Sequence, residues 1–228
     1  VEDNYGADED TFAGASPDSD TSVTDYERCL DLDRAVAFEH YVRNEAKVTR
    51  TCFISAPAQG LVYQIKSTKP FSIFIHCDGA FIREKDYKEN HFTLTGICPG
   101  RSGLKVIKEN KPEEFLFPDE PELQGVHFIG EGCVTAEGGR AAVSADGILL
   151  EHVTGVEIRM AIRTSFRGFD KAYTEQYSDA QIHHMLAADL EKLSKPFEKL
   201  LNEHVEEYRS FYGRTSLRLW DDVPKISA

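Results

Sequence analysis

The sequence predicts a mainly β protein, an antiparallel β-sandwich followed by linker helices. From Arg34 to about Arg163 the chain consists of short runs rich in β-branched and aromatic residues, separated by turn residues. After Asp170 the apolar residues no longer alternate but recur every third or fourth position. Many short strands with close turns are typical of a sandwich or barrel, whereas the later spacing is that of amphipathic helices.

The first strands are predicted in pairs. Ala35–Val42 and Lys47–Ile54 are linked by Arg43–Ala46, a segment that suits a hairpin turn. Two further strands, Leu61–Lys66 and Phe71–His76, are expected on either side of a turn that contains Pro70.

Later strands are separated by glycine-containing turns and by one long interruption. The expected strands are His91–Ile97, Val126–Thr135, Ala141–Val143, Ile148–Glu151 and Val156–Arg163. Glycine-rich segments at 137–140 and 145–147 indicate tight turns between them. The proline-rich segment Pro99–Pro121 predicts a long surface excursion, which is either functional or disordered.

Two helices are predicted after the strands. Ser178-Asp-Ala-Gln181 fits a capping box and begins a helix with Ile182, Leu186, Leu190 and Leu193 on one face. Pro196 is tolerated only in a first helical turn, so a second helix starts there and stops at Gly213. The apolar stripe of that helix comprises Phe197, Leu200, Leu201, His204, Val205, Tyr208 and Phe211. Such a stripe needs a surface to cover it, either the sandwich or a helical domain outside this chain.

The charge of the chain is unevenly distributed. The net charge is −13, and residues 1–25 contain eight acidic residues and no Lys or Arg. The remaining residues, 31 acidic and 26 basic, give a net charge of about −5. This composition excludes a general attraction to nucleic acid and predicts that residues 1–24 form an acidic flexible arm.

The cysteines bear on the cellular compartment. There are five, an odd number, with no CxxC pair, and the sequence has no Asn-x-Ser/Thr glycosylation site. Unpaired thiols favour a reducing, cytoplasmic location. A secreted protein whose signal peptide has been removed is the alternative. No run approaches the roughly 20 apolar residues of a membrane-spanning helix.

No catalytic, cofactor-binding or metal-binding residue is assigned from the sequence. Asp18-x-Asp20 resembles the start of a calcium loop, but Val23 and Cys29 stand where such a loop needs Gly and Glu. His183 and His184 are adjacent and point about 100° apart on a helix, so they do not share one metal ion. No phosphate-binding or dinucleotide-binding glycine motif is present. We therefore expect no cofactor.

The remaining candidate residues have structural interpretations. The cluster Cys98–Gly103 combines a thiol, an arginine and glycines but has no assignable His or Asp partner, so a turn is expected. The acidic pairs Glu113-Glu114 and Asp119-Glu120 lie in the proline-rich excursion, where solvated side chains are expected. Aromatic residues within strand runs are expected to pack in the core rather than bind sugars: Phe53, Tyr63, Phe71, Phe74 and Phe128.

Five segments in order resemble the N-terminal domain of glycoside hydrolase family 95, the α-L-fucosidases. Their first is Tyr26–Ala37, similar to the family's Y-x-R-x-L-D-L-x-x-A stretch. The others are Val48–Ser55, Gln124–Gly139 with its Gly-x-x-Phe strand and Gly-Gly hairpin, Ala161–Phe166, and His204–Arg214 with its His-x-x-x-Tyr pattern. The resemblance covers roughly Asp25 to Leu219.

This resemblance implies a super-sandwich domain that lacks catalytic residues of its own. The parent enzyme would hydrolyse terminal, typically α-1,2-linked, L-fucose with inversion, using an (α/α)6 barrel that should follow this chain. We expect this chain alone to be inactive, with its own barrel as partner and the oligosaccharide bound through that barrel. Family members begin with an Ala-x-Pro-x-Gly-Asn-Gly-like motif and the first strands, whereas this chain begins with the acidic segment, so an incomplete sandwich is expected.

The sequence thus divides into an acidic arm at 1–24, a β-sandwich at 25–170 and a helical linker at 171–228. The favoured hypothesis is a non-catalytic domain that braces the catalytic domain of a glycoside hydrolase. The alternatives are an independent carbohydrate-binding sandwich module and a free-standing enzyme. The unpartnered stripe from Phe197 to Phe211 favours the first hypothesis.

Overall fold

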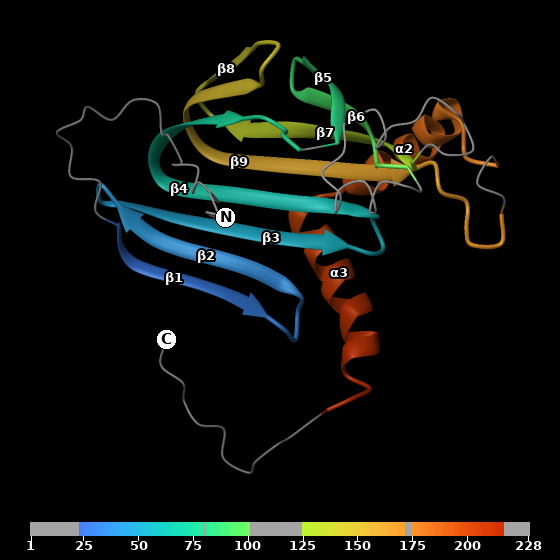
Figure 1. Ribbon diagram of the computed structural model, residues 1–228. Coiled ribbons are helices and arrows are strands. Elements are labelled where there is room, and N and C mark those ends of the chain that lie inside the picture. The colour runs from blue at the N-terminus through green and yellow to red at the C-terminus, as the bar shows by residue number, and fades with distance from the viewer. Residues whose placement is uncertain (1–22, 80, 101–124, 172–174, 217–228) are drawn as a thin grey trace, which may run out of the picture.

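The computed structural model describes residues 23–79, 81–100, 125–171 and 175–216, which form nine strands and two helices (Figure 1). The strands form one antiparallel sheet in the order β1-β2-β3-β4-β9-β7-β6-β5, and β8 pairs with β9 outside this path. The strands are β1 (Val23–Asp31), β2 (Val36–Arg43), β3 (Ala46–Ser55), β4 (Gly60–Ile75), β5 (Ile82–Lys88), β6 (His91–Ile97), β7 (His127–Glu137), β8 (Arg140–Val143) and β9 (Ile148–Thr164). The helices are α2 (Asp179–Leu193) and α3 (Phe197–Tyr212).

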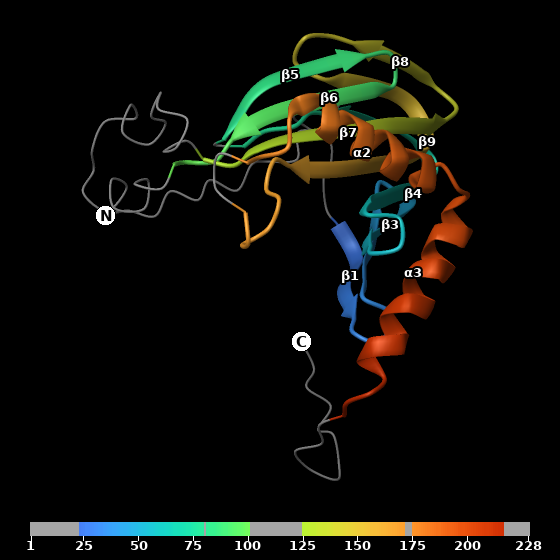
Figure 2. The ribbon, with the colours of Figure 1, turned by 90° about the vertical axis from the view of Figure 1, so that its right-hand side faces the viewer.

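The long strands β4 and β9 turn the sheet into a sandwich. The end of β4, from Phe71 to Ile75, pairs with the beginning of β9, from Ile148 to Val153, and β8 pairs with this same part of β9. These segments fold back over β5, β6 and β7 (Figures 1 and 2). The core between these layers includes Ile75, Ile148 and Leu150 on one side and Tyr87 and Phe92 on the other. The predicted antiparallel sandwich followed by helices is confirmed.

The β2–β3 hairpin is as predicted. Asn44 and Glu45 both have positive φ angles, 51° and 59°, so they occupy the central positions of a tight hairpin turn. Antiparallel pairing then runs from Arg43 opposite Ala46 to Ala37 opposite Cys52.

Two predicted interruptions are wrong, because the backbone continues through both as strand. Pro70 does not end a strand: β4 runs from Gly60 to Ile75, and its register with β9 shifts between Lys66 and Phe71. A proline is tolerated at such an irregularity because no ladder hydrogen bond from its nitrogen is required there. Likewise the segments expected at Ile148–Glu151 and Val156–Arg163 form the single strand β9.

Strands β1 and β5 were not predicted, and both are edge strands with mostly polar, exposed residues. Strand β1 begins at Val23, so the expected acidic arm of residues 1–24 overlaps a strand at its end. The rest of that arm lies outside the described residues, as do residues 101–124 of the predicted proline-rich excursion.

The helices cover the face of the sheet opposite the sandwich core. Helix α2 packs on β9, β7 and β4, and α3 leaves it to contact β3 at a steep angle to the strand (Figures 1 and 2). A second core fills this contact and includes Phe53, Val62, Ile129 and Ala161 from the sheet. The helices contribute Ile182, Leu186, Leu193 and Leu200, each no more than 1% exposed.

The predicted helix boundaries are confirmed. The Ser178 side chain accepts a hydrogen bond from the backbone N–H of Gln181, and the Gln181 side chain accepts one from the backbone N–H of Ser178. These two bonds form the predicted capping box at the start of α2. Pro196 precedes α3, and Gly213 ends it. Neither described helix is long and apolar enough to span a membrane.

Candidate docking surface

The apolar stripe of α3 is divided between two environments. Its first half is covered by the sheet: Leu200 and His204 are 0% and 3% exposed, and the Phe197 ring meets Phe53 edge-on at 5.8 Å. Its last turn projects beyond the sheet, where Phe211 is 59% exposed and Tyr212 is 44% exposed. The sheet therefore buries only the first half of the apolar stripe.

His204 fastens the middle of α3 to the sheet. Its ring stacks on Phe53 at 5.0 Å, and its Nε2 lies 3.1 Å from the carbonyl oxygen of Ala35 in the β1–β2 turn. Five residues further along α3, Arg209 forms an ion pair with Asp33 of the same β1–β2 turn. These two contacts fix the direction in which the end of α3 projects.

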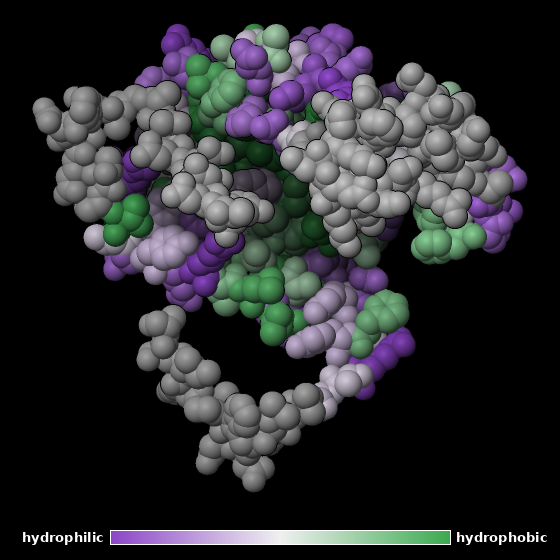
Figure 3. Space-filling model, in the orientation of Figure 1, coloured by the Kyte–Doolittle hydropathy of each residue, from purple (hydrophilic) through white to green (hydrophobic). Residues whose placement is uncertain are grey.

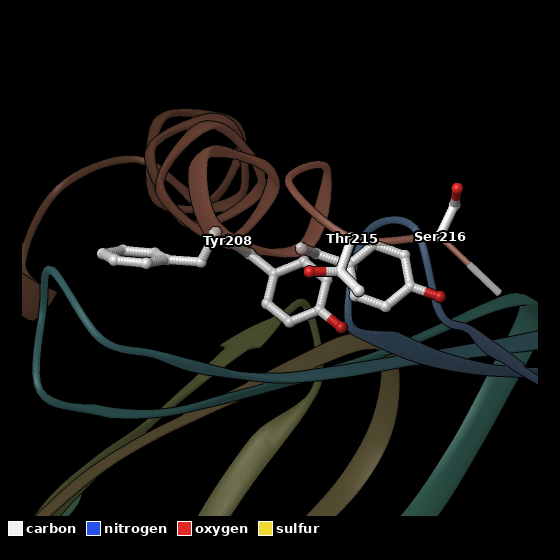
Figure 4. A pocket seen from close by; sticks show the side chains of 5 residues that line it. Tyr208, Thr215 and Ser216 are labelled. Atoms are coloured by element: carbon white, nitrogen blue, oxygen red, sulfur yellow. The ribbon is translucent and has the colours of Figure 1, made fainter.

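The exposed end of α3 contains a hollow of about 700 Å³, lined by Tyr208, Phe211, Tyr212, Thr215 and Ser216 (Figure 4). The rings of Tyr208 and Tyr212 stack at 5.2 Å, and the Arg214 guanidinium lies 4.9 Å from the centre of the Phe211 ring. In the space-filling view, apolar and near-neutral side chains gather over this end of α3 (Figure 3).

The chemistry of this hollow suits contact with another protein surface. Its lining is mainly aromatic, and it includes no carboxylate, histidine or cysteine that could act as a nucleophile or as a general acid or base. Large aromatic rings at the end of a rigid helix are the side chains that dominate buried protein interfaces.

A buried ion pair anchors α2 to the sheet. Asp189 is 1% exposed, and its carboxylate accepts hydrogen bonds from Arg163 on β9 at 2.6 Å and from Lys192 at 3.2 Å. Burial by itself raises the pKa of Asp189, but the bonds from Arg163 and Lys192 outweigh burial and hold the pKa below its ordinary value. Asp189 is therefore ionised at neutral pH, and α2 is held in one position on the sheet.

A family comparison identifies the chain. Residues 11–169 match the model of the glycosyl hydrolase family 65 N-terminal domain, which is more than half of the sequence. The chain belongs to this family. Its antiparallel sandwich is thus an N-terminal glycoside hydrolase domain.

One curated protein and one solved structure are similar to this member of the glycosyl hydrolase family 65 N-terminal domain family. The chain is 24% identical over 200 residues to Alpha-L-fucosidase 2 of Arabidopsis thaliana, covering 85% of this chain and 23% of that protein. A solved structure described as a kojibiose phosphorylase from the human microbiome superposes with a TM-score of 0.54 at 10% identity, covering 84% of this chain and 25% of that one. The second likeness concerns the fold alone. This family member therefore spans about a quarter of the length of the proteins it resembles.

The structure separates the residues that the sequence had singled out. His183 pairs with Glu131 of β7 at 2.6 Å, while the adjacent His184 is exposed on another side of α2. Within the described ranges, no group of three or more metal-ligating side chains occurs. The acidic pairs at 113–114 and 119–120 and the Asp18-x-Asp20 segment lie outside those ranges.

The cluster Cys98–Gly103 is described only as far as Gly100. The backbone N–H of Cys98 bonds to the Val126 carbonyl at 2.9 Å, so this half-buried cysteine continues the β6–β7 pairing. All five cysteines are free thiols. Burial raises the pKa of Cys52, Cys77 and Cys133, which keeps these thiols protonated and unreactive near neutral pH.

The aromatic residues predicted to pack in the core do so in most but not all cases. Phe53 is buried, and Tyr63 and Phe71 pack against the sandwich core. Phe74 is 44% exposed and stacks on His76 at 5.7 Å, so its predicted core position is wrong. Phe71, Ile73 and Ile75 face the core from one side of β4, so strand alternation places Phe74 on the opposite, exposed side.

Sequence reasoning missed part of the docking surface. Tyr212, Thr215 and Ser216 do not belong to the predicted stripe, yet they line the hollow with Tyr208 and Phe211. Helical periodicity identifies the apolar face of α3, but it contains no information on where the supporting sheet ends. The position of the β1–β2 turn decides which part of that face stays exposed.

Proposed function

We propose that this domain is a non-catalytic N-terminal part of a glycoside hydrolase that releases L-fucose, and that it braces a catalytic domain through the exposed end of α3. The observation that carries the proposal is the division of the α3 stripe. The sheet covers Leu200 and His204, while Phe211 and Tyr212 project beyond it. An aromatic surface on a rigidly anchored helix calls for a partner surface.

The occupant proposed for this surface is the catalytic domain of the same polypeptide. Helix α3 follows the last strand and ends at Tyr212, so the chain leaves the sandwich at the hollow. A domain that continues from there would meet the exposed rings first. The fucosidase relative is about four times as long as the matched segment, which supports a parent protein with further domains.

L-Fucose, typically α-1,2-linked, is proposed as the sugar that the parent enzyme releases. Support for the sugar comes from the name of the Arabidopsis relative and from the ordered motifs of the sequence. A fold of this kind does not by itself choose a substrate. The proposal therefore assigns the reaction to the catalytic domain and none of its steps to this chain.

Fucose release from 2′-fucosyllactose tests the assignment of activity. The purified chain should release no fucose, and the full-length enzyme should release it. Turnover that follows the purified chain through chromatography would show that the chain is itself an enzyme. A full-length protein that leaves 2′-fucosyllactose and other α-L-fucosides intact would disprove the proposed substrate.

Variants of α3 test the docking role in the full-length enzyme. Phe211→Ser together with Tyr212→Ser should lower the thermal stability of the catalytic domain and reduce fucose release. Glu206→Ser changes an exposed residue of the same helix outside the hollow and serves as the control. Equal behaviour of the double variant and the control would mean that the end of α3 is not the docking surface.

A further inference from the structure

The face of the sheet opposite α3 carries a group of aromatic and charged side chains on β1, β2 and β3. We call Tyr26, Arg28, Glu39, Tyr41 and Arg50 the tyrosine–arginine patch. Apart from their neighbours in the sheet, no described helix or strand contacts β1 or β2 extensively, so none of the described elements covers this face at the β1 edge.

Strand register sets the charged row of the patch. Arg28 on β1 lies opposite Glu39 on β2, and Glu39 lies opposite Arg50 on β3. Directly opposite residues share one face of a sheet, so a carboxylate stands between two guanidinium groups. Glu39 and Arg50 are joined at 3.7 Å, and both side chains are about one-fifth exposed. Exposed Arg28 forms no ion pair with any residue that the structure describes.

An aromatic wall borders this row. The rings of Tyr26 and Tyr41 lie 6.5 Å apart and are tilted by 32°. The Tyr41 hydroxyl accepts a hydrogen bond from Arg50 at 3.2 Å, so Tyr41 is held in place and supports the outer ring. Tyr41 is 6% exposed, whereas Tyr26 is 57% exposed. The supported Tyr26 ring therefore presents a flat apolar surface beside Arg28.

We infer that the tyrosine–arginine patch is a binding site for a glycan that carries a carboxylate, such as a uronic acid residue. The Tyr26 ring would contact the apolar face of the sugar, and Arg28 would form a charge-assisted hydrogen bond to its carboxylate. Glu39, fixed by Arg50, would accept a hydrogen bond from a sugar hydroxyl. The choice of a glycan as ligand class rests on the proposed function, whereas the choice of an acidic one rests on charge.

Charge complementarity decides between an acidic and a neutral sugar. The patch carries two guanidinium groups against one carboxylate, whereas residues 26–228, with 31 acidic and 26 basic residues, carry a net charge of about −5. The nearby acidic residue Glu27 points to the other face, where it lies 3.5 Å from His40. A local positive site on an otherwise acidic protein attracts an anionic ligand selectively, because the remaining surface repels it.

Calorimetric titration of the whole chain with tetragalacturonate tests the inference, with a neutral galactose tetramer as the matched ligand. At physiological ionic strength we expect saturable binding of the acidic tetramer only. Arg28→Gln and Tyr26→Ala should each weaken it about tenfold, and Arg28→Lys should retain part of it. Arg140→Gln removes the same charge from an exposed position on β8 and should change nothing. Circular dichroism of each variant confirms that it is folded.

Three outcomes would overturn the inference. The first is that tetragalacturonate gives no saturable heat, and the second is that Arg28→Gln and Arg140→Gln weaken its binding equally. The third is that the neutral tetramer binds as tightly as tetragalacturonate and that Arg28→Gln does not change its affinity. None of them bears on fucose release or on docking through Phe211, so the two proposals fail independently.

Discussion

The imidazole of His204 on α3 bonds to the backbone carbonyl oxygen of Ala35, across 169 positions of sequence, at 3.1 Å. Ala35 has a φ angle of 50°, a left-handed conformation that directs its carbonyl towards the helix. The β1–β2 turn and the helix that follows the sandwich are thereby joined at one buried point. The orientation of the docking surface depends on this contact.

Replacement of His204 should destabilise the whole domain. His204→Ala removes the ring stacked on Phe53 and leaves the Ala35 carbonyl without its bond, so we expect a loss of about 2–4 kcal/mol in the free energy of unfolding. Urea unfolding followed by circular dichroism measures the loss. Glu206→Ala, on the exposed side of the same helix, is the control. Similar losses for both variants would contradict the role given to His204.

Stability should depend on pH through Asp189. Its pKa is lower in the folded protein than in the unfolded chain, so the ionised carboxylate stabilises the fold above the ordinary Asp pKa of about 4. This contribution is lost as the pH falls through the lowered folded pKa. Asp189→Asn should cost about 3 kcal/mol at pH near 7, since it leaves the Arg163 charge without its partner.

Urea unfolding of wild type and Asp189→Asn between neutral and acidic pH measures this dependence. The difference between them should shrink as the pH drops below about 4. Asp170→Asn, at an exposed position, provides a comparison in which little change is expected at any pH. A difference for Asp189→Asn that stays constant down to acidic pH would show that its carboxylate does not carry the linkage.

The two ends of α3 should respond differently to truncation in the isolated chain. Leu200 is 0% exposed, so Leu200→Ala should lower the free energy of unfolding by about 2–5 kcal/mol. Phe211 is 59% exposed, so Phe211→Ala should change it by no more than about 0.5 kcal/mol. Urea denaturation of both variants and the wild type under the same conditions measures the two changes in the free energy of unfolding. A large cost for Phe211→Ala would mean that this ring is packed within the chain and is not available for docking.

Backbone strain in the turn before β4 can be relieved. Gln59 has a φ angle of 58°, which costs an L-residue about 1 kcal/mol relative to glycine. Its side chain also donates a bond to the Ala56 carbonyl at 2.7 Å. Gln59→Ala loses this bond and keeps the strain, whereas Gln59→Gly loses both. We therefore expect the glycine variant to melt at a higher temperature than the alanine variant, and the reverse order would argue against strain at this position.

Local patterns in the sequence were sufficient for the β2–β3 hairpin, for β6 and for both helices. In each case the signal is contained in neighbouring residues: alternation with a short turn in the hairpin, and the Ser178–Gln181 capping box and Gly213 at the helix ends. The ordered motifs likewise led to an N-terminal glycoside hydrolase domain, which the family match confirms. The boundaries proposed at residues 24 and 170 remain predictions.

Other features arise only from contacts between segments far apart in sequence. Strand β1 is mostly polar and becomes a strand because β2 pairs with one of its edges. The sequence around Pro70 predicts the end of a strand. In the structure β4 pairs with β9 on both sides of Pro70, and the register of that pairing shifts between Lys66 and Phe71.

The two surfaces on which the proposals rest belong to this second group. Periodicity established that α3 has one apolar face, but the bond from His204 to Ala35 decided which part of that face the sheet covers. Arg28, Glu39 and Arg50 are eleven residues apart from one to the next, and no local rule relates them. Sheet register brings them into one row, because hydrogen-bonded backbones align side chains from separate strands on a common face.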